Sequence, residues 1–259
     1  MSMQGRWRLA SCALAALVFA AGCGGSGAPP AQQAPPANAK RGDAATAGSV
    51  TGRVSYEGPA IENPAVKLES DPACASQHPG GMTVDAFQVA NGGLDNVFVY
   101  VKTGLDGYYF EAPTTPVVLD QKGCRYTPHV FGVRTGQPLE IVNSDQTMHN
   151  VHAMGRVNQE FNFGQPFQGI KNTKTFTAPE IMVPFKCNVH GWMTAYAGIV
   201  SHPYFAVTAG GGAFKIEGLP PGTYTIEAWH EKLGTRTETV TVAEKESKPV
   251  SFAFKATLP

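Results

Sequence analysis

The stretch VPFKCNVHGWM, residues 183–193, joins a strand pattern to a loop of unusual chemistry. Val183, Phe185 and Cys187 alternate along the chain, as they do in a β-strand that directs every second side chain to the same face. The spacing C-x2-H-x2-M then brings a thiol, an imidazole and a thioether close together in Cys187, His190 and Met193. Only a loop can wrap three such groups around one ion, so we predict that the strand ends near Cys187 and that a metal-binding loop follows.

Short alternating runs occur along most of the remaining chain, which has 259 residues and a hydrophobic content of 42%. Glycine (29 residues) and proline (20 residues) separate these runs, and after the N-terminal segment we find no convincing helical period. The predicted strands include residues 50–56, 96–101, 139–142, 214–216, 224–229 and 237–242. The fold class that this pattern predicts is all-β, with antiparallel sheets packed as sandwiches.

The upstream pair His149-Asn150 follows the predicted strand 139–142 and offers a second imidazole. Two neutral imidazoles, one thiolate and a weak thioether are the ligands of a mononuclear type 1 copper site. Each of these residues alone would more often belong to a core, but the set together favours metal binding. A binuclear copper centre would need a second cysteine in the loop, and a catalytic Cys–His pair would leave Met193 unexplained.

Residues 113–203 resemble the cupredoxin family, in which an H-N pair lies upstream of a C-x(n)-H-x(n)-M loop, and the short loop resembles its short-loop members. The resemblance implies a Greek-key β-sandwich that binds copper as Cu+ or Cu2+. By this likeness His149, Cys187 and His190 are the equatorial ligands and Met193 is the axial ligand, while Asn150 braces the cysteine loop through hydrogen bonds. The implied role is a non-enzymatic one-electron carrier that meets a redox partner protein at the edge of His190.

A second resemblance lies near the C-terminus, where residues 212–226 read GAFKIEGLPPGTYTI. This stretch resembles the carboxypeptidase regulatory-like (transthyretin-like) family, an Ig-like β-sandwich whose first strand reads V-x-G-x-V. That strand occurs far upstream, at residues 50–54. We therefore expect residues 48–112 and 204–259 to form one sandwich, into which a cupredoxin domain of residues 113–203 is inserted. The alternative is two domains in simple sequence order.

The five cysteines divide among several roles. Cys12 lies in the N-terminal apolar run, and Cys23 follows a stretch of small residues that resembles a bacterial lipobox. An exported chain meets an oxidising compartment, where Cys74 and Cys124 are the natural disulfide pair because Cys187 has a use as a ligand. The alternative leaves all three as free, buried thiols.

The N-terminus has the features of an export signal, with Arg6 and Arg8 before an apolar run that is too short to span a bilayer. We expect residues 1–22 to be a signal peptide and residues 23–47 to be a lipidated N-terminus and flexible linker, with the lipid on Cys23. Ordinary secretory cleavage is the alternative. These features predict a lipoprotein anchored to a membrane and facing the bacterial periplasm or the cell surface.

Charge argues against one class of partner. Lys+Arg and Asp+Glu balance at 20 each without a basic block, so we expect no nucleic-acid partner. Two functions compete with electron transfer. One is copper capture or delivery without redox turnover, and the other is a surface binding module whose metal site has no redox role.

Overall fold

The computed structural model describes residues 35–256. The predicted signal peptide, the lipidation site Cys23 and the linker up to residue 34 lie outside the described residues. Within the described range the chain has eighteen strands and one short helix, so the prediction of an all-β fold is confirmed. No helix of this part of the chain is long and apolar enough to cross a membrane.

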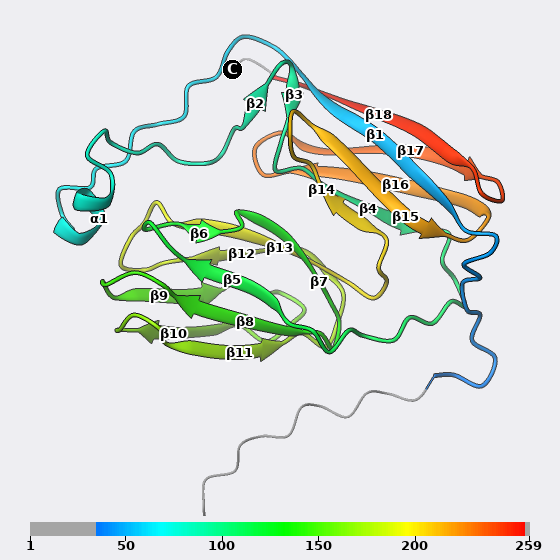
Figure 1. The fold of residues 1–259 in the computed structure, drawn as a ribbon, viewed down its shortest axis with the longest axis horizontal. Coiled ribbons are helices and arrows are strands. Elements are labelled where there is room, and N and C mark those ends of the chain that lie inside the picture. The colour runs from blue at the N-terminus through cyan, green and yellow to red at the C-terminus, as the bar shows by residue number, and fades with distance from the viewer. Residues whose placement is uncertain (1–34, 257–259) are drawn as a thin grey trace, which may run out of the picture. The chain divides into compact units, whose positions relative to one another are not determined.

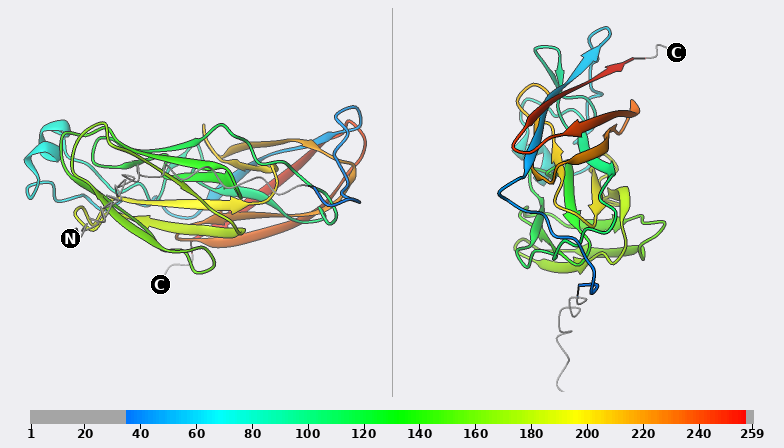
Figure 2. Two further views of the ribbon diagram at one scale, coloured as in Figure 1. Left: turned by 90° about the horizontal axis from the view of Figure 1, so that it is seen from below. Right: turned by 90° about the vertical axis from the view of Figure 1, so that its right-hand side faces the viewer.

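Two of the sheets are built from strands at both ends of the described chain. Their strands are β1 (Gly48–Glu57), β2 (Val89–Ala90), β3 (Gly93–Leu94), β4 (Phe98–Thr103), β14 (Phe205–Val207), β15 (Ala213–Leu219), β16 (Gly222–His230), β17 (Gly234–Val242) and β18 (Ser247–Lys255). One sheet has the order β15-β1-β3-β2, with β18 also paired to β1, and the other has the order β14-β4-β16-β17. β1 and β18 run parallel, side by side (Figures 1 and 2), so the last strand is hydrogen-bonded to the first. We call these two sheets sandwich A.

The other two sheets use only the central part of the chain and hold the metal motifs. Their strands are β5 (Val117–Gln121), β6 (Tyr126–Thr127), β7 (Val130–Arg134), β8 (Pro138–Asn143), β9 (His149–Ala153), β10 (Phe161–Gln165), β11 (Lys171–Thr175), β12 (Glu180–Lys186) and β13 (Thr194–Val200). The sheet orders are β10-β9-β12-β13-β7 and β11-β8-β5-β6 (Figure 1). We call these two sheets sandwich B.

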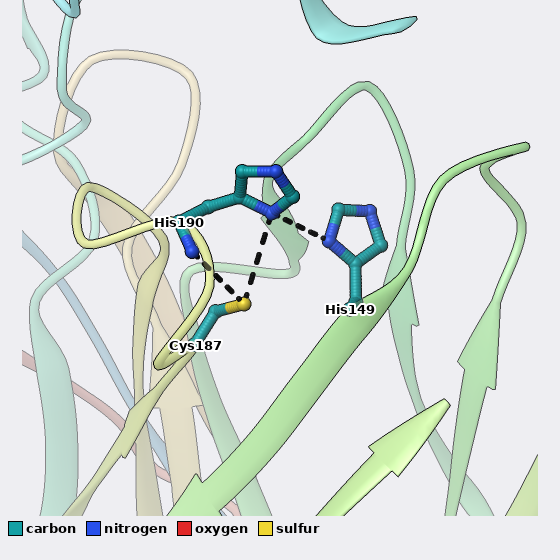
Figure 3. Close-up of side chains that lie close together, drawn as sticks. All are labelled: His149, Cys187 and His190. Atoms are coloured by element: carbon teal, nitrogen blue, oxygen red, sulfur yellow. Dashed lines mark hydrogen bonds between the residues drawn. The ribbon is translucent and has the colours of Figure 1, made fainter. Parts of the chain in front are cut away.

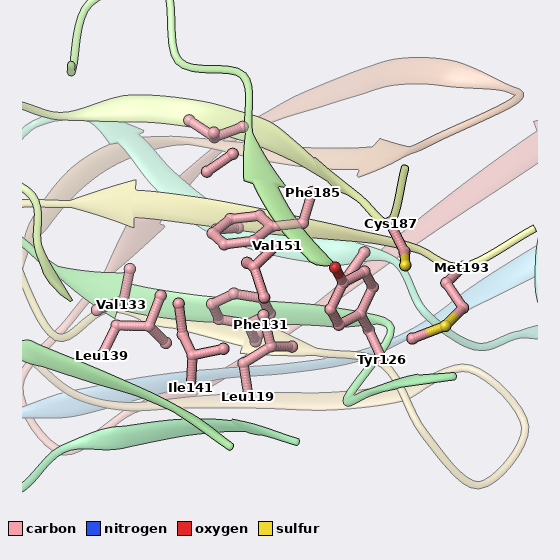
Figure 4. Close-up of a cluster of buried hydrophobic side chains, with 14 of the residues drawn as sticks. Leu119, Tyr126, Phe131, Val133, Leu139, Ile141, Val151, Phe185, Cys187 and Met193 are labelled. Atoms are coloured by element: carbon pink, nitrogen blue, oxygen red, sulfur yellow. The ribbon is translucent and has the colours of Figure 1, made fainter. Parts of the chain in front are cut away.

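Alternation explains why these segments form half-buried strands. In β8, Leu139 and Ile141 are fully buried while the residues between them are partly exposed, and in β15 Phe214 and Ile216 alternate with exposed residues. Leu139 and Ile141 join Phe131, Val151 and their neighbours in the core of sandwich B (Figure 4). Burial of such side chains contributes about 1.5–3 kcal/mol each, which drives the two sheets together.

The two sandwiches meet through small residues on one side and aromatic rings on the other. Phe98 of β4 packs against Gly198 of β13, and Phe205 of β14 packs against Gly132 of β7. The described residues 35–256 all fall within one compact unit. The division into a sandwich of residues 48–112 with 204–259 and an inserted domain of residues 113–203 therefore stays a prediction.

The chain between β1 and β2 leaves sandwich A and packs on sandwich B. We call residues 64–85 of this connection the strap. Its side chains Leu68, Cys74 and Met82 belong to the same buried cluster as Cys187, and Asp85 forms a salt bridge with Arg125. The strap also contains the one helix of the described chain, α1 (Pro72–Gln77), which the sequence pattern did not predict.

Helix α1 forms for local reasons. Asp71 is its N-cap and accepts hydrogen bonds from the backbone N–H groups of Ala73 and Cys74, at 2.8 and 3.1 Å. Pro72 occupies the first turn, where its missing N–H costs nothing. The helix is too short to show an amphipathic period, so periodicity could not reveal it.

Candidate metal centre

Three potential ligand atoms from two separate segments converge at one end of sandwich B. The Nδ1 atoms of His149 and His190 lie 3.0 Å apart, and the Sγ atom of Cys187 lies 3.8 Å from His190 Nδ1 (Figure 3). All three ligand atoms lie within 4.8 Å of one another. The side chains are buried, with 0%, 2% and 2% of His149, Cys187 and His190 exposed.

The ends of the strands explain this convergence. His149 is the first residue of β9. β12 ends at Lys186, so Cys187 begins the loop. The Cys187 N–H donates to the Met193 carbonyl (3.2 Å) and the Met193 N–H donates to the His190 carbonyl (2.9 Å), which folds the loop back into β13. A tight loop thus returns both His190 and Met193 to Cys187.

Met193 is 1% exposed and lies beside Cys187 at the end of the core, with Tyr126 next to both (Figure 4). Of the four predicted ligands, the structure brings the ligand atoms of His149, Cys187 and His190 together, and Met193 is a buried neighbour of Cys187.

Asn150 links the two ligand segments. Its backbone N–H donates to Cys187 Sγ (3.4 Å), and its Oδ1 accepts from the Asn188 N–H (3.1 Å). Its Nδ2 donates to Asn162 Oδ1 on β10 (2.7 Å), which fixes the amide. These contacts hold the cysteine loop against β9, so Asn150 has the hydrogen bonds that a bracing residue requires.

Two aspartates that the sequence analysis missed hold the far sides of both histidine rings. His149 Nε2 lies 2.8 Å from Asp145 Oδ2, and His190 Nε2 lies 2.9 Å from Asp71 Oδ2. A carboxylate on Nε2 fixes the ring so that the lone pair of Nδ1 faces the site. Asp145 lies four residues before His149 and could have been suspected, but nothing in the sequence places Asp71 of the strap near His190.

The titration of these groups follows from their contacts. Burial raises the pKa of the Cys187 thiol, but hydrogen bonds with His149, His190 and backbone N–H groups outweigh it and bring that pKa down to about 6. Burial lowers the pKa of His149, but the bond to Asp145 and the adjacent Cys187 raise it to about 8. Burial raises the pKa of Asp71, yet the hydrogen bond with His190 and those from Thr147 and the α1 backbone lower it to about 2. The site therefore favours a thiolate.

A disulfide between Cys74 and Cys124 closes the site on the side of the strap, with the Cα atoms 5.7 Å apart. Cys74 Sγ lies 3.7 Å from His190 Nε2. Trp192 donates from Nε1 to the Cys124 carbonyl (3.0 Å), and its ring lies 5.0 Å from the ring of His190. The strap and the disulfide thus cover the edge of His190 at which we expected a redox partner to bind.

The other described histidines have partners away from this cluster. His129 contacts the Thr194 carbonyl and Glu231, and His152 contacts Glu160. His78 contacts the Gly123 carbonyl. His202 and His230 lie in or beside sandwich A.

The donor set fits a soft cation. When each Nε2–H donates a hydrogen bond to its carboxylate, both Nδ1 lone pairs and the Cys187 thiolate can face one ion. Metal–nitrogen and metal–sulfur bonds of about 2.0–2.3 Å put ligand atoms about 3–4.5 Å apart, which is the spacing of this cluster. One thiolate, two imidazoles and a neighbouring thioether are the ligand types of copper rather than of magnesium or calcium.

No family model and no curated protein sequence matches the chain. Among solved structures, a copper-containing nitrite reductase from Thermus scotoductus SA-01 is 22% identical, with a TM-score of 0.29 over 34% of this chain and 23% of that one. The chain thus spans less than a quarter of that enzyme. The Cu(I) form of an amicyanin mutant is 22% identical, with a TM-score of 0.30 over 34% and 84% of the two chains. A second Cu(I) amicyanin mutant is 19% identical, with a TM-score of 0.30 over 40% and 99%. These low scores do not establish a family for the chain.

Proposed function

We propose that the protein binds one copper ion in a type 1 site and acts as a one-electron carrier outside the cytoplasm. The observation that carries this proposal is the convergence of His149 Nδ1, His190 Nδ1 and Cys187 Sγ, with Met193 beside the thiol. A bound copper ion would supply a single electron by changing between Cu+ and Cu2+. The proposal includes no enzymatic step, because it assigns the thiolate and both imidazoles to the ion as ligands.

The surrounding residues support reversible electron transfer because they hold the ligands in one geometry. Asp145 and Asp71 orient the two rings, and Asn150 ties the cysteine loop to β9. A rigid, buried ligand set lets the ion change charge with little movement of the protein. In the same proposal the cupredoxin-like unit is residues 113–203, set within a transthyretin-like sandwich, and Cys23 carries a lipid that anchors the protein to a membrane of the periplasm or cell surface.

One observation favours a second function, copper capture and delivery. All four predicted ligands are 2% exposed or less, and a covered site would hold its ion between encounters. A delivery protein would pass the ion to an acceptor, whereas a carrier would keep it through many oxidation cycles.

The test is copper loading of the chain that lacks residues 1–22, followed by visible absorption and electron paramagnetic resonance. We expect a strong thiolate-to-copper absorption band and one copper per chain, both lost in Cys187→Ser and His149→Ala. The matched control is His152→Gln, whose imidazole lies on the same strand but bonds Glu160. Colourless copper binding, or a band that survives Cys187→Ser, would contradict the type 1 site. Repeated oxidation and reduction without loss of the ion would then separate the carrier from the delivery protein.

A further inference from the structure

The imidazole of His190 is covered by a part of the chain that is remote in sequence. Its Nε2 atom faces Asp71 Oδ2 at 2.9 Å and Cys74 Sγ at 3.7 Å, and the whole residue is 2% exposed. Asp71 itself is held by Thr147, whose Oγ1 donates to Oδ2 at 2.9 Å. A partner that approaches this edge would meet the strap and not the ring.

The strap is attached to sandwich B at several points. The disulfide joins Cys74 of α1 to Cys124 of sandwich B, and both sulfur-bearing residues are 0% exposed. His78 contacts the Gly123 carbonyl through Nε2 at 2.8 Å, and Arg125 forms a salt bridge with Asp85 and donates to the Thr83 carbonyl at 2.7 Å. Because the disulfide is buried, the strap stays over His190 as long as the disulfide is intact.

Trp192 contacts the covered ring of His190 and is itself partly exposed at the protein surface. Its ring centroid lies 5.0 Å from that of His190 at an interplanar angle of 45°, and the side chain is only partly buried at the edge of the core of sandwich B. The hydrogen bond from Nε1 to the Cys124 carbonyl holds the indole in place at 3.0 Å. The indole thus joins a buried ligand to the surface through aromatic contact.

We propose that the strap seals the edge of His190 and that Trp192 is the surface group through which a one-electron partner reaches the site. This inference rests on the proposed function. In the step, a partner in van der Waals contact with Trp192 accepts one electron, the protein is oxidised by one electron, and no atom or proton is transferred. Trp192 is therefore a residue that sets where a partner binds, without being a ligand.

The seal can be tested on the metal-free protein with diethyl pyrocarbonate, which modifies accessible imidazoles. We expect His190 to stay unmodified under conditions that modify His152, whose side chain is 19% exposed. In the double variant Cys74→Ala/Cys124→Ala, with folding verified by circular dichroism, His190 becomes reactive. Modification of His190 as fast as His152 in the wild type would overturn the seal.

The route can be tested with Cu+-loaded protein and hexacyanoferrate(III) as the one-electron acceptor, in a stopped-flow measurement. We expect Trp192→Leu to react on the order of tenfold more slowly while keeping the wild-type copper absorption band. Trp192→Phe, which keeps an aromatic ring beside His190, should stay near the wild-type rate. The matched control Trp229→Leu removes a half-buried indole that contacts Tyr196 instead, and should leave the rate unchanged.

The outcomes distinguish a failure of the seal or of the Trp192 route from a failure of the proposed function. A Trp192→Leu rate equal to wild type would overturn the route even when the copper band is present. A faster reaction of Cys74→Ala/Cys124→Ala would support the seal, because the edge of His190 would then be open, and an unchanged rate would contradict it. Absence of the thiolate-to-copper band in the wild type would contradict the proposed function, while the modification of the metal-free protein would still decide the seal.

Discussion

His190 Nε2 lies 2.9 Å from the Oδ2 atom of Asp71, a residue 119 positions earlier in the sequence. The same carboxylate caps helix α1 through its other oxygen. One side chain therefore couples the start of a helix in the strap to the orientation of a predicted ligand. Carboxylates in this position hold the ring and increase the basicity of its other nitrogen.

Asp71→Asn should weaken copper binding without unfolding α1. Asparagine caps helices about as well as aspartate, so the helix should persist, but the charge next to His190 is lost. We expect the affinity for copper to fall by about 10- to 100-fold, measured by competition with a chromophoric chelator. The control is Glu69→Gln, an exposed neighbour in the strap. Equal affinities for Asp71→Asn and wild type would show that the carboxylate does not act on the site.

Met193→Leu should separate the role of Met193 as an axial ligand from its role in core packing. Met193 is 1% exposed, and a swap of similar volume should change the free energy of unfolding by less than about 1.5 kcal/mol. Copper should still bind, while the reduction potential and the absorption spectrum change because the weak thioether is gone. Voltammetry and absorption spectra test this, with Met182→Leu as the control for a buried methionine in a different cluster. An unaltered potential would contradict an axial role.

Gly198→Ala should destabilise the contact between the two sandwiches. A Cβ atom at Gly198 would lie 2.3 Å from Cζ of Phe98, which the packed ring cannot avoid without a shift. Overpacking of this kind costs about 1–3 kcal/mol. Chemical denaturation should show the loss, whereas Gly80→Ala, with no heavy atom within 4 Å of its added Cβ, should leave the midpoint unchanged. A wild-type midpoint for Gly198→Ala would mean that the interface relaxes freely.

The stability of the protein should fall on acidification partly because of His230. This residue is 1% exposed, and its Nε2 atom has no hydrogen-bond partner. Burial lowers its pKa from 6.5 to about 4, so the unfolded chain takes up the proton first as the pH drops. The contribution of the buried, neutral His230 to the free energy of unfolding is fully present above pH 6.5 and is lost as the pH falls toward 4.

The variant His230→Phe tests this pH dependence. It should flatten the curve of unfolding free energy against pH between 6.5 and 4, with a difference from wild type of up to about 3 kcal/mol across that window. Urea titrations at several pH values measure it. His152→Gln, a replacement near the surface, serves as the control. A wild-type slope for His230→Phe would assign the acid sensitivity to other groups.

Removal of the disulfide should cost much of the stability of the strap region. Cys74 and Cys124 are 50 residues apart, and closing a loop of that length stabilises the folded state by about 4 kcal/mol in the chain-entropy treatment. Cys74→Ala/Cys124→Ala should therefore lower the thermal midpoint. Differential scanning calorimetry without a reductant measures the thermal midpoint of both proteins. A midpoint equal to that of the wild type would show that the other strap contacts suffice.

Local patterns in the sequence were sufficient to predict the all-β class and the chemical types of the ligands. Alternation in runs such as residues 139–142 predicts strands because the side chains of a strand face two sides in turn. The spacing from Cys187 to Met193 confines three groups to one loop, and His149 follows a strand end, so local geometry alone makes these residues candidates.

The residues that surround the ligands come from distant segments and follow only from how the chain packs. Asp71 and Cys74 reach His190 because the connection between β1 and β2 crosses from one sandwich to the other, and no local pattern in the strap records that crossing. A contact over 119 residues depends on how the two sandwiches pack, and periodicity reports only neighbours in the chain. For the same reason the sequence suggested a partner at the edge of His190, which the packed structure covers.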